Sequence, residues 1–333
     1  MSAARSTLPS SPARQQILDA ADFGRVALLM GGDSAEREVS LLTGKAVVDA
    51  LLSRGVQVEP VDAGGRDLAE RLLQGGYDRV FNALHGPGGE DGVVSGLLQV
   101  LDLPCTGSGH AALALSMDKH FSKLAFAFAG IPTPAWRMAR NLPEARASSR
   151  KLGLPVGLKP NNQGSSLGIS RVDLPAEIDA AYRDAAQYGS EVIVESWIEG
   201  GEYTASMLQG EMLPVVRIVP PEGDFYDFHT KYESAGTRYL CPCGLAPERE
   251  AEINRQAQAA IRELRVSGWA RVDLMLDSRQ DLWVLEVNTV PGMTAHSLVP
   301  MAAAEAGISF GELCWRILET SFDRDSSNPG AAQ

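Results

Sequence analysis

Two polar side chains, Glu286 and Asn288, interrupt the apolar run LEVNTVPG near the C-terminus. The preceding DLMLDSRQDLWV is typical of a β-hairpin with its turn near Ser278–Gln280, which sets Asp273 roughly opposite Glu286. Side chains alternate along a strand, so Arg271 shares a face with Asp273. Glu286 and Asn288 share a face for the same reason. If the register joins these faces, two carboxylates and an amide oxygen converge, and such hard ligands suit Mg²⁺.

Two plainer interpretations of this hairpin stay open. Its polar face could be the solvent-exposed side of an antiparallel pair, and Asn288 before Thr-Val-Pro-Gly could serve the turn. Charge repulsion counts against the first, because two carboxylates that oppose each other across a hairpin destabilise it unless a cation lies between them.

Phosphate chemistry is indicated by a lysine followed by a loop of small residues. Lys159 ends the strand VGLK, and the backbone N–H groups of Gly164–Gly168 could wrap around phosphate oxygens. Lys119 and Lys231 could add point charges. A mobile Gly/Ser hairpin loop beside solvated lysines explains the loop equally well.

Two familiar nucleotide motifs do not account for this chemistry. The P-loop pattern GxxxxGK[ST] is absent, since Gly44-Lys45 is followed by Ala46. Gly107–Ala112 matches GxGxxA but closes no compact βαβ unit, so we interpret it as a turn that leads into a helix.

The elements that must position these residues differ between the two halves of the chain. Strand-turn-helix units begin at Val26 and Val80, which predicts a parallel sheet whose loops after Met30 and Leu84 share one crevice. From Ile131 onward short strands alternate with hairpin signals, which predicts α+β structure with antiparallel sheets. The fold class is therefore α/β followed by α+β.

Composition narrows the class of protein. A chain of 333 residues fits two or three domains. The net charge of −12 argues against nucleic acid as a partner, and the four cysteines lack the spacing of a zinc site or a disulfide framework. No stretch has signal-peptide or membrane-span character, so we expect a cytoplasmic protein. Residues 1–22 and 324–333 are expected to be disordered tails.

The joint set of motifs resembles the D-alanine:D-alanine ligase family of ATP-grasp enzymes. The resemblance rests on GGDSAEREVSL, ALHGPGGEDG, TGSGHAALALSMDK, GLKPNNQGSSLGIS, ARVDLML and LEVNTVPGMTAHSLVPMAA. It covers Phe23 to about Phe322 in the family order. It implies ATP-dependent joining of two D-alanines through an acyl phosphate for cell-wall precursors, with two Mg²⁺ (or Mn²⁺) ions and a homodimer. It also implies a Rossmann-like domain (23–117), then a two-part ATP-grasp fold (118–203 and 204–323).

The resemblance further implies roles for residues at matching motif positions. For ATP these are Lys119, Lys159, Ser166, Glu195, Ile198, Glu202 and Lys231. For the two metal ions they are Asp273, Glu286 and Asn288. For the amino-acid substrates and their chemistry they are Glu36, His85, Ser165, Tyr232, Arg271, Gly292, Ser297 and Leu298. The segment 223–232, which contains Tyr232, suits a lid over the reaction. Gln163 and Ser196 depart from the family pattern, which puts only details of nucleotide contact in doubt.

Several of these residues also have plain structural explanations. Glu36 falls in the first turn of a helix, where any acid is favoured by the helix dipole. Ser297 is an expected N-cap, which agrees with a substrate role because free N–H groups at a helix N-terminus suit a carboxylate. On sequence alone His85 is better explained as a structural loop histidine.

Competing functions are a ligase of the same fold with D-lactate or D-serine as second substrate, and a regulator that binds ATP without turnover. Intact Lys159, Asp273 and Arg271 argue against the regulator, because binding alone needs no oxyanion group beside metal ligands.

Overall fold

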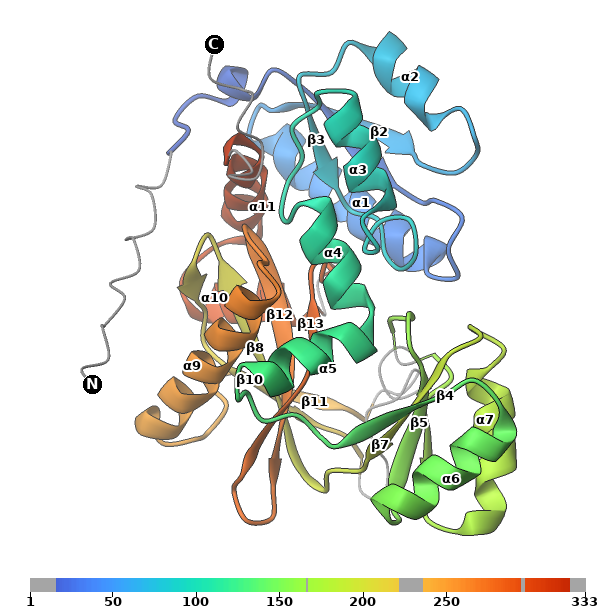
Figure 1. Ribbon diagram of the computed structural model, residues 1–333. Coiled ribbons are helices and arrows are strands. Elements are labelled where there is room, and N and C mark those ends of the chain that lie inside the picture. The colour runs from blue at the N-terminus through green and yellow to red at the C-terminus, as the bar shows by residue number, and fades with distance from the viewer. Residues whose placement is uncertain (1–15, 166, 222–235, 295–296, 324–333) are drawn as a thin grey trace, which may run out of the picture.

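Three sheets make up the frame of the protein, as Figure 1 shows for the computed structural model. The described residues are 16–165, 167–221, 236–294 and 297–323. A parallel sheet near the N-terminus (blue) lies at one end, a four-stranded sheet (green) lies at the other, and a larger sheet (yellow to red) stands beside them. The described candidate site residues lie on the two antiparallel sheets, on helix ends and on loops, including the loops that follow β1 and β3 of the parallel sheet.

The first sheet is parallel, as predicted. Its strand order is β2-β1-β3, and Val26, Ala27, Leu28 and Leu29 of the middle strand are all buried. Such a continuous apolar run is expected where helices cover both faces of a parallel sheet. The elements are β1 (Arg25–Met30), α1 (Arg37–Ser53), β2 (Gln57–Asp62), α2 (Leu68–Gly75), β3 (Arg79–Asn82) and α3 (Val93–Val100).

The four-stranded sheet is antiparallel and separates a core face from a site face. Along β5, Val156 and Leu158 pack against helices in an apolar cluster, whereas Gly157 and Lys159 line a cavity on the opposite face. Its order is β4-β7-β5-β6. The elements are β4 (Trp136–Ala139), α6 (Leu142–Leu152), β5 (Val156–Pro160), β6 (Ser170–Val172), η2 (Pro175–Glu177), α7 (Ile178–Ala185) and β7 (Val192–Ser196).

The largest sheet is also antiparallel, which confirms the prediction for the second half of the chain. Its order is β11-β10-β8-β12-β13, and β9 pairs with β8. Its strands are β8 (Gly200–Leu208), β9 (Glu211–Met212), β10 (Val216–Val219), β11 (Arg238–Leu240), β12 (Trp269–Asp277) and β13 (Leu282–Asn288). Around it lie α4 (His110–Met117), α5 (Lys119–Phe128), α9 (Pro247–Glu263), α10 (Leu298–Glu305), α11 (Phe310–Glu319) and η3 (Thr320–Phe322). No helix among the described residues is long and apolar enough to cross a bilayer.

The segment that matches GxGxxA is a turn before a helix, as interpreted from the sequence. Gly109 is the N-cap of α4, and the turn is anchored to the far end of the chain. Gly107 donates its N–H to Thr320 Oγ1 at 2.9 Å, and Ser108 Oγ accepts from the Ser267 N–H at 3.0 Å. This turn therefore joins the parallel sheet to the strand β12.

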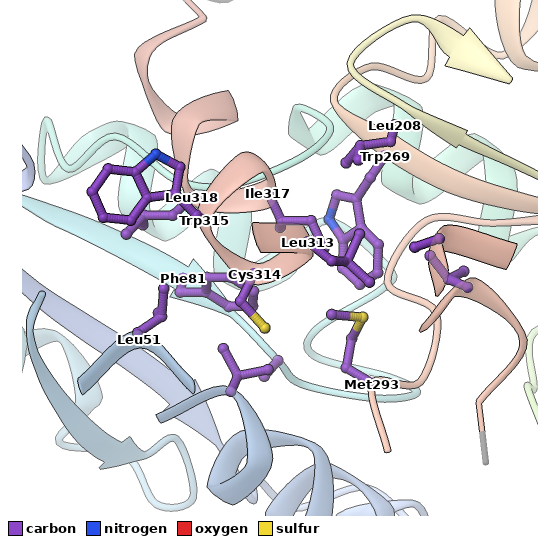
Figure 2. Packing of buried hydrophobic residues seen from close by; sticks show 14 of the residues in the cluster. Leu51, Phe81, Leu208, Trp269, Met293, Leu313, Cys314, Trp315, Ile317 and Leu318 are labelled. Atoms are coloured by element: carbon purple, nitrogen blue, oxygen red, sulfur yellow. The ribbon is translucent and has the colours of Figure 1, made fainter. Parts of the chain in front are cut away.

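The prediction that residues 1–22 form a disordered tail is wrong from residue 16 onward. Ile17 is 8% exposed, its N–H donates to Glu319 Oε1 at 3.0 Å, and its carbonyl accepts from the Trp315 ring at 3.3 Å. The segment continues into η1 (Ala20–Phe23), where Phe23 stacks edge-on against Trp315. Figure 2 shows Trp315 of α11 in this core region with Phe81 of β3 and Leu51 of α1. Ile17 is a single buried side chain in a largely polar stretch, so the composition of the stretch did not reveal that it is ordered. The predicted tail 324–333 lies outside the described residues.

Gly268 lies where the backbone before β12 packs closely against the turn at Gly107. Its φ is +73°, and an added Cβ would lie 2.9 Å from Gly107 Cα. Gly307 has a similar φ of +77° but nothing within 4 Å. We expect Gly307→Ala to lower the free energy of unfolding by about 1 kcal/mol through backbone strain. Gly268→Ala should cost about 1–3 kcal/mol more through overpacking. Urea unfolding of both variants checks this, and equal losses would contradict it.

Candidate functional site

The hairpin β12–β13 has the predicted register. Asp273 lies opposite Glu286 and Arg271 lies opposite Asn288, with a bulge just after Asp273. The turn closes with the Gln280 N–H on the Asp277 carbonyl at 2.9 Å. The four candidate side chains therefore meet at one end of the hairpin.

The polar face of this hairpin is not a solvated surface, because two of its side chains are buried and Glu286 and Asn288 are partly buried. Arg271 and Asp273 are 7% and 9% exposed. The guanidinium donates from Nε and Nη2 to the two oxygens of Asp273 at 2.7 and 2.8 Å. Asn288 Nδ2 donates to Asp273 Oδ2 at 2.9 Å. Burial of a charged pair is costly unless geometry is good, and this bidentate contact meets that condition.

Lys119 connects the hairpin to the loop after β5. It is the first residue of α5, and its ammonium lies 3.2 Å from Glu286 Oε2 and donates to the Gln163 carbonyl at 2.6 Å. Burial by itself raises the pKa of Glu286, but the charges of Lys119, Lys159 and Arg271 lower it to about 2. Glu286 is therefore ionised at neutral pH and available to a cation.

A second charged group lies across the cavity, centred on Glu195 of β7. Its Oε1 lies 2.5 Å from Lys159 Nζ, and its Oε2 lies 2.9 Å from Lys123 Nζ. Burial by itself raises the pKa of Glu195, but the two lysines outweigh it and lower the pKa to about 2. Burial lowers the pKa of Lys123 to about 8. The pKa of Lys159 is raised, because its carboxylate neighbours outweigh its burial.

Lys123 was not identified as a site residue from the sequence, although its position relative to Lys119 could have indicated it. It follows Lys119 by one helical turn, so both lysines lie on the same face of α5. A lysine on the buried face of an amphipathic helix needs a counter-ion. The sequence does not show where that counter-ion lies.

These groups surround one cavity of about 360 Å³ between the two antiparallel sheets. Its polar wall contains Lys159, Glu195, Asp273 and Glu286. The remaining wall is largely apolar, and it includes Pro134, Ile169, Trp197, Ile198, Met275 and Leu285. Glu202 and Ser165 also line it. A charged end beside an apolar slot suits a ligand that has an anionic part and a flat apolar part.

The oxygen ligands of the hairpin fit a small hard cation. A carboxylate has about four acceptor sites, so Asp273 keeps capacity beyond its present donors. Asn288 turns its nitrogen toward Asp273, which leaves the amide oxygen for a cation. In the part of the chain described, no three His, Cys, Asp or Glu side chains gather closely enough to hold a metal by themselves. Two carboxylates with an amide suit Mg²⁺, which keeps water or phosphate oxygens as further ligands.

A second cluster forms around Glu36, where the parallel sheet meets the Gly/Ser loop. Ser165 Oγ donates to Glu36 Oε2, and Ser34 Oγ donates to the His85 carbonyl at 2.7 Å. Added Cβ atoms at Gly86 and Gly164 would lie 3.0 and 2.8 Å from Glu36 Oε1. The loops after β1 and β3 therefore lie in contact, as expected where parallel strands end at one edge of a sheet. Glu36 is the N-cap of α1 rather than part of its first turn, because the helix begins at Arg37.

His85 has a protein partner on each ring nitrogen. Nε2 lies 3.0 Å from Thr43 Oγ1, and Nδ1 lies 3.4 Å from Glu90 Oε1. The side chain is buried. These contacts agree with the interpretation of His85 as a structural loop histidine.

Ser297 is the N-cap of α10, as expected, but its side chain does not cap the helix. Its Oγ instead contacts the N–H and Oγ1 of Thr294, both at 3.0 Å. An added Cβ at Gly292 would lie 3.0 Å from the same oxygen. The Leu298 side chain is buried in the core, so only its backbone N–H could reach a ligand. Ser166, Lys231, Tyr232 and the expected lid 223–232 lie outside the described residues.

Acid should weaken the contact between Glu195 and its two lysines. Since the pKa of Glu195 is 4.5 in its reference state and about 2 when folded, its contribution to stability is complete above about pH 4.5 and is lost as pH falls toward 2. Glu195→Gln should be less stable by about 3 kcal/mol at neutral pH, because two buried lysines lose their partner. Urea unfolding across this pH window should show the difference shrinking in acid. Glu211→Gln, at an exposed carboxylate, is the control, and a difference that stays constant with pH would contradict the assignment.

The geometry can be compared with that of known proteins. A family model described as D-ala D-ala ligase C-terminus matches residues 125–319. A D-alanine–D-alanine ligase from Methylococcus capsulatus is 52% identical over 308 residues, which cover 92% of this chain and 99% of the relative. The structure of D-alanine–D-alanine ligase from Bacillus anthracis complexed with ATP matches with a TM-score of 0.78 at 33% identity, covering 90% of this chain and 97% of that one. The VanG D-Ala:D-Ser ligase from Enterococcus faecalis matches with a TM-score of 0.76 at 27% identity, covering 89% of this chain and 99% of that one. The chain therefore belongs to the D-alanine–D-alanine ligase family.

Proposed function

We propose that this protein joins two D-alanines into D-alanyl-D-alanine with ATP, as a step toward peptidoglycan precursors. The observation that carries the proposal is the hydrogen-bonded convergence of Arg271, Asp273 and Asn288 on one hairpin face beside the cavity. A carboxylate resists attack because oxide is a poor leaving group. Transfer of the γ-phosphoryl of ATP to it forms an acyl phosphate, which the amine of the second D-alanine attacks with loss of phosphate.

The charged end of the cavity suits the phosphates of ATP. Lys119 and Lys159 neutralise phosphate charge, with Lys231 and the backbone at Ser166 in support. Ile198 and Glu202 line the same cavity and hold the nucleoside, together with Glu195 at the edge of its polar wall. Asp273, Glu286 and Asn288 would hold two Mg²⁺ (or Mn²⁺) ions. When bound, such ions neutralise developing charge on the transferring phosphoryl group.

The reacting carboxylate lies beside Arg271. Its guanidinium, held rigid by Asp273, and the backbone at Gly292 stabilise the oxyanion of the tetrahedral intermediate. Glu36 takes the ammonium of the first D-alanine, with His85 nearby, and Ser165 fixes the Glu36 carboxylate. The helix N-terminus at Ser297 and Leu298 takes the carboxylate of the second D-alanine. Tyr232 belongs to the proposed lid that keeps water from the acyl phosphate.

The same proposal extends to architecture and cell location. The parallel order β2-β1-β3 supports a Rossmann-like unit over 23–117, and the two antiparallel sheets support an ATP-grasp pair divided as 118–203 and 204–323. ATP as co-substrate supports a cytoplasmic location. A homodimer is the proposed assembly, and equilibrium sedimentation tests it.

The competing candidates differ in the second substrate or in turnover. Likeness to a D-Ala:D-Ser ligase makes D-serine the principal alternative acceptor. A binding-only regulator would have no need of Arg271 as an oxyanion group beside the carboxylates that would hold metal ions.

Substrate choice can be measured directly. We expect phosphate release from ATP to depend on D-alanine, to be at least tenfold slower with L-alanine, and to yield mainly D-alanyl-D-alanine when D-alanine, D-serine and D-lactate compete. Mass spectrometry of the products identifies the acceptor. If D-alanyl-D-serine or D-alanyl-D-lactate dominated, D-serine or D-lactate would be the second substrate in place of D-alanine. Phosphate release that did not depend on D-alanine would refute the ligase function.

The metal assignment can be tested at Glu286. Glu286→Gln removes one charged ligand while keeping its size, so turnover should fall at least tenfold, or about 1.4 kcal/mol at the transition state. The Mg²⁺ concentration for half-maximal rate should rise. Glu211→Gln, at an exposed strand position, serves as the matched control. Turnover that stays unchanged at limiting Mg²⁺ would remove Glu286 from the metal site.

A further inference from the structure

Lys123 is fully buried and does not line the cavity formed by the described residues. Its ammonium donates to Thr133 Oγ1 at 2.8 Å and lies 2.9 Å from Glu195 Oε2. The Trp136 ring lies 5.7 Å from the same nitrogen. Lys123 therefore stands behind Glu195, on the side away from the ligand.

Glu195 is shared between two lysines, one on each oxygen. Lys159 contacts Oε1 from the cavity side, and Lys123 contacts Oε2 from behind. The three groups together carry one net positive charge. Without Lys123 the remaining pair of Lys159 and Glu195 would be neutral, and its attraction for an anion would be weaker.

We infer that Lys123 is a positioning residue of the nucleotide cavity: it holds and neutralises Glu195 from behind, so that Lys159 presents its charge to phosphate. This rests on the proposed binding of ATP. The fold supports the inference in a second way, because α5 carries both Lys119 and Lys123. One helix thus supplies a lysine to the Glu286 side of the site and another to the Glu195 side.

Binding of ADP with Mg²⁺, measured by isothermal titration calorimetry without amino acids, tests this step apart from turnover. We expect Lys123→Met to weaken ADP binding about tenfold, because the variant removes the net positive charge of the group formed with Lys159 and Glu195. Under turnover, the KM for ATP should rise while the KM for D-alanine stays within twofold. Lys45→Met, at an exposed lysine, changes the total charge equally and should leave both unchanged.

A double-mutant cycle distinguishes action through Glu195 from a general effect. In the Glu195→Gln background the carboxylate that contacts Lys159 directly is gone, so adding Lys123→Met should weaken ADP binding less than threefold. Equal losses in both backgrounds would overturn the inference, as would a folded Lys123→Met protein with normal ADP affinity.

A second variant covers the case in which Lys123→Met does not fold. Lys123→Gln keeps a hydrogen-bond donor for Glu195 but removes the charge, and we expect the same loss of ADP affinity. Normal ADP binding by Lys123→Gln would overturn the inference. A wild-type protein that binds ADP but makes no dipeptide would refute the ligase function and leave this inference standing.

Discussion

The register of β12 is the constraint on which the site depends. This strand pairs with β8 on one side and β13 on the other over nearly its whole length. A slip of one residue would turn Arg271 and Asp273 toward the apolar core and bring Val272 to the site face. The two neighbouring strands exclude that slip, since either pairing alone already sets which face each side chain takes. The bulge after Asp273 changes the register only on the turn side of the Asp273–Glu286 pair, so Arg271, Asp273 and Asn288 keep theirs.

Buried charge is the second constraint, and each carboxylate of the site satisfies it through contacts with positively charged or hydrogen-bonding side chains. Asp273 accepts hydrogen bonds from Arg271 and Asn288. Glu286 forms an ion pair with Lys119, and Glu195 forms ion pairs with two lysines. An isolated buried charge would cost many kcal/mol, so each carboxylate needs a cation from another element or from the next position on its face. Such an arrangement is already organised for an anionic ligand. Ligand phosphates would then exchange one set of ionic contacts for another without first creating the charges.

The Gly/Ser loop after β5 connects groups of the site that belong to separate sheets. The Gly/Ser loop after β5 contacts Lys119 through the Gln163 carbonyl and Glu36 through Ser165. A Cβ at position 164 would lie 2.8 Å from Glu36 Oε1, so any larger residue there would displace that carboxylate. The loop therefore links the parallel sheet to the cavity, so the cluster around Glu36 and the charged wall of the cavity are joined by continuous contacts.

The sequence by itself determined the local elements and the chemistry on each face. Period-two alternation predicted the hairpin that places Asp273 opposite Glu286, and the strand-turn-helix units predicted the parallel sheet. Only the tertiary structure decided which faces were buried and which elements met. Lys123 and Glu195 come from a helix and a strand that share no sequence pattern, Glu36 meets Ser165 across 129 residues, and Ile17 docks under Trp315 across 298. The physical reason is that periodicity reports which side of an element faces inward, whereas the partner across the core depends on packing between elements that are distant in the chain.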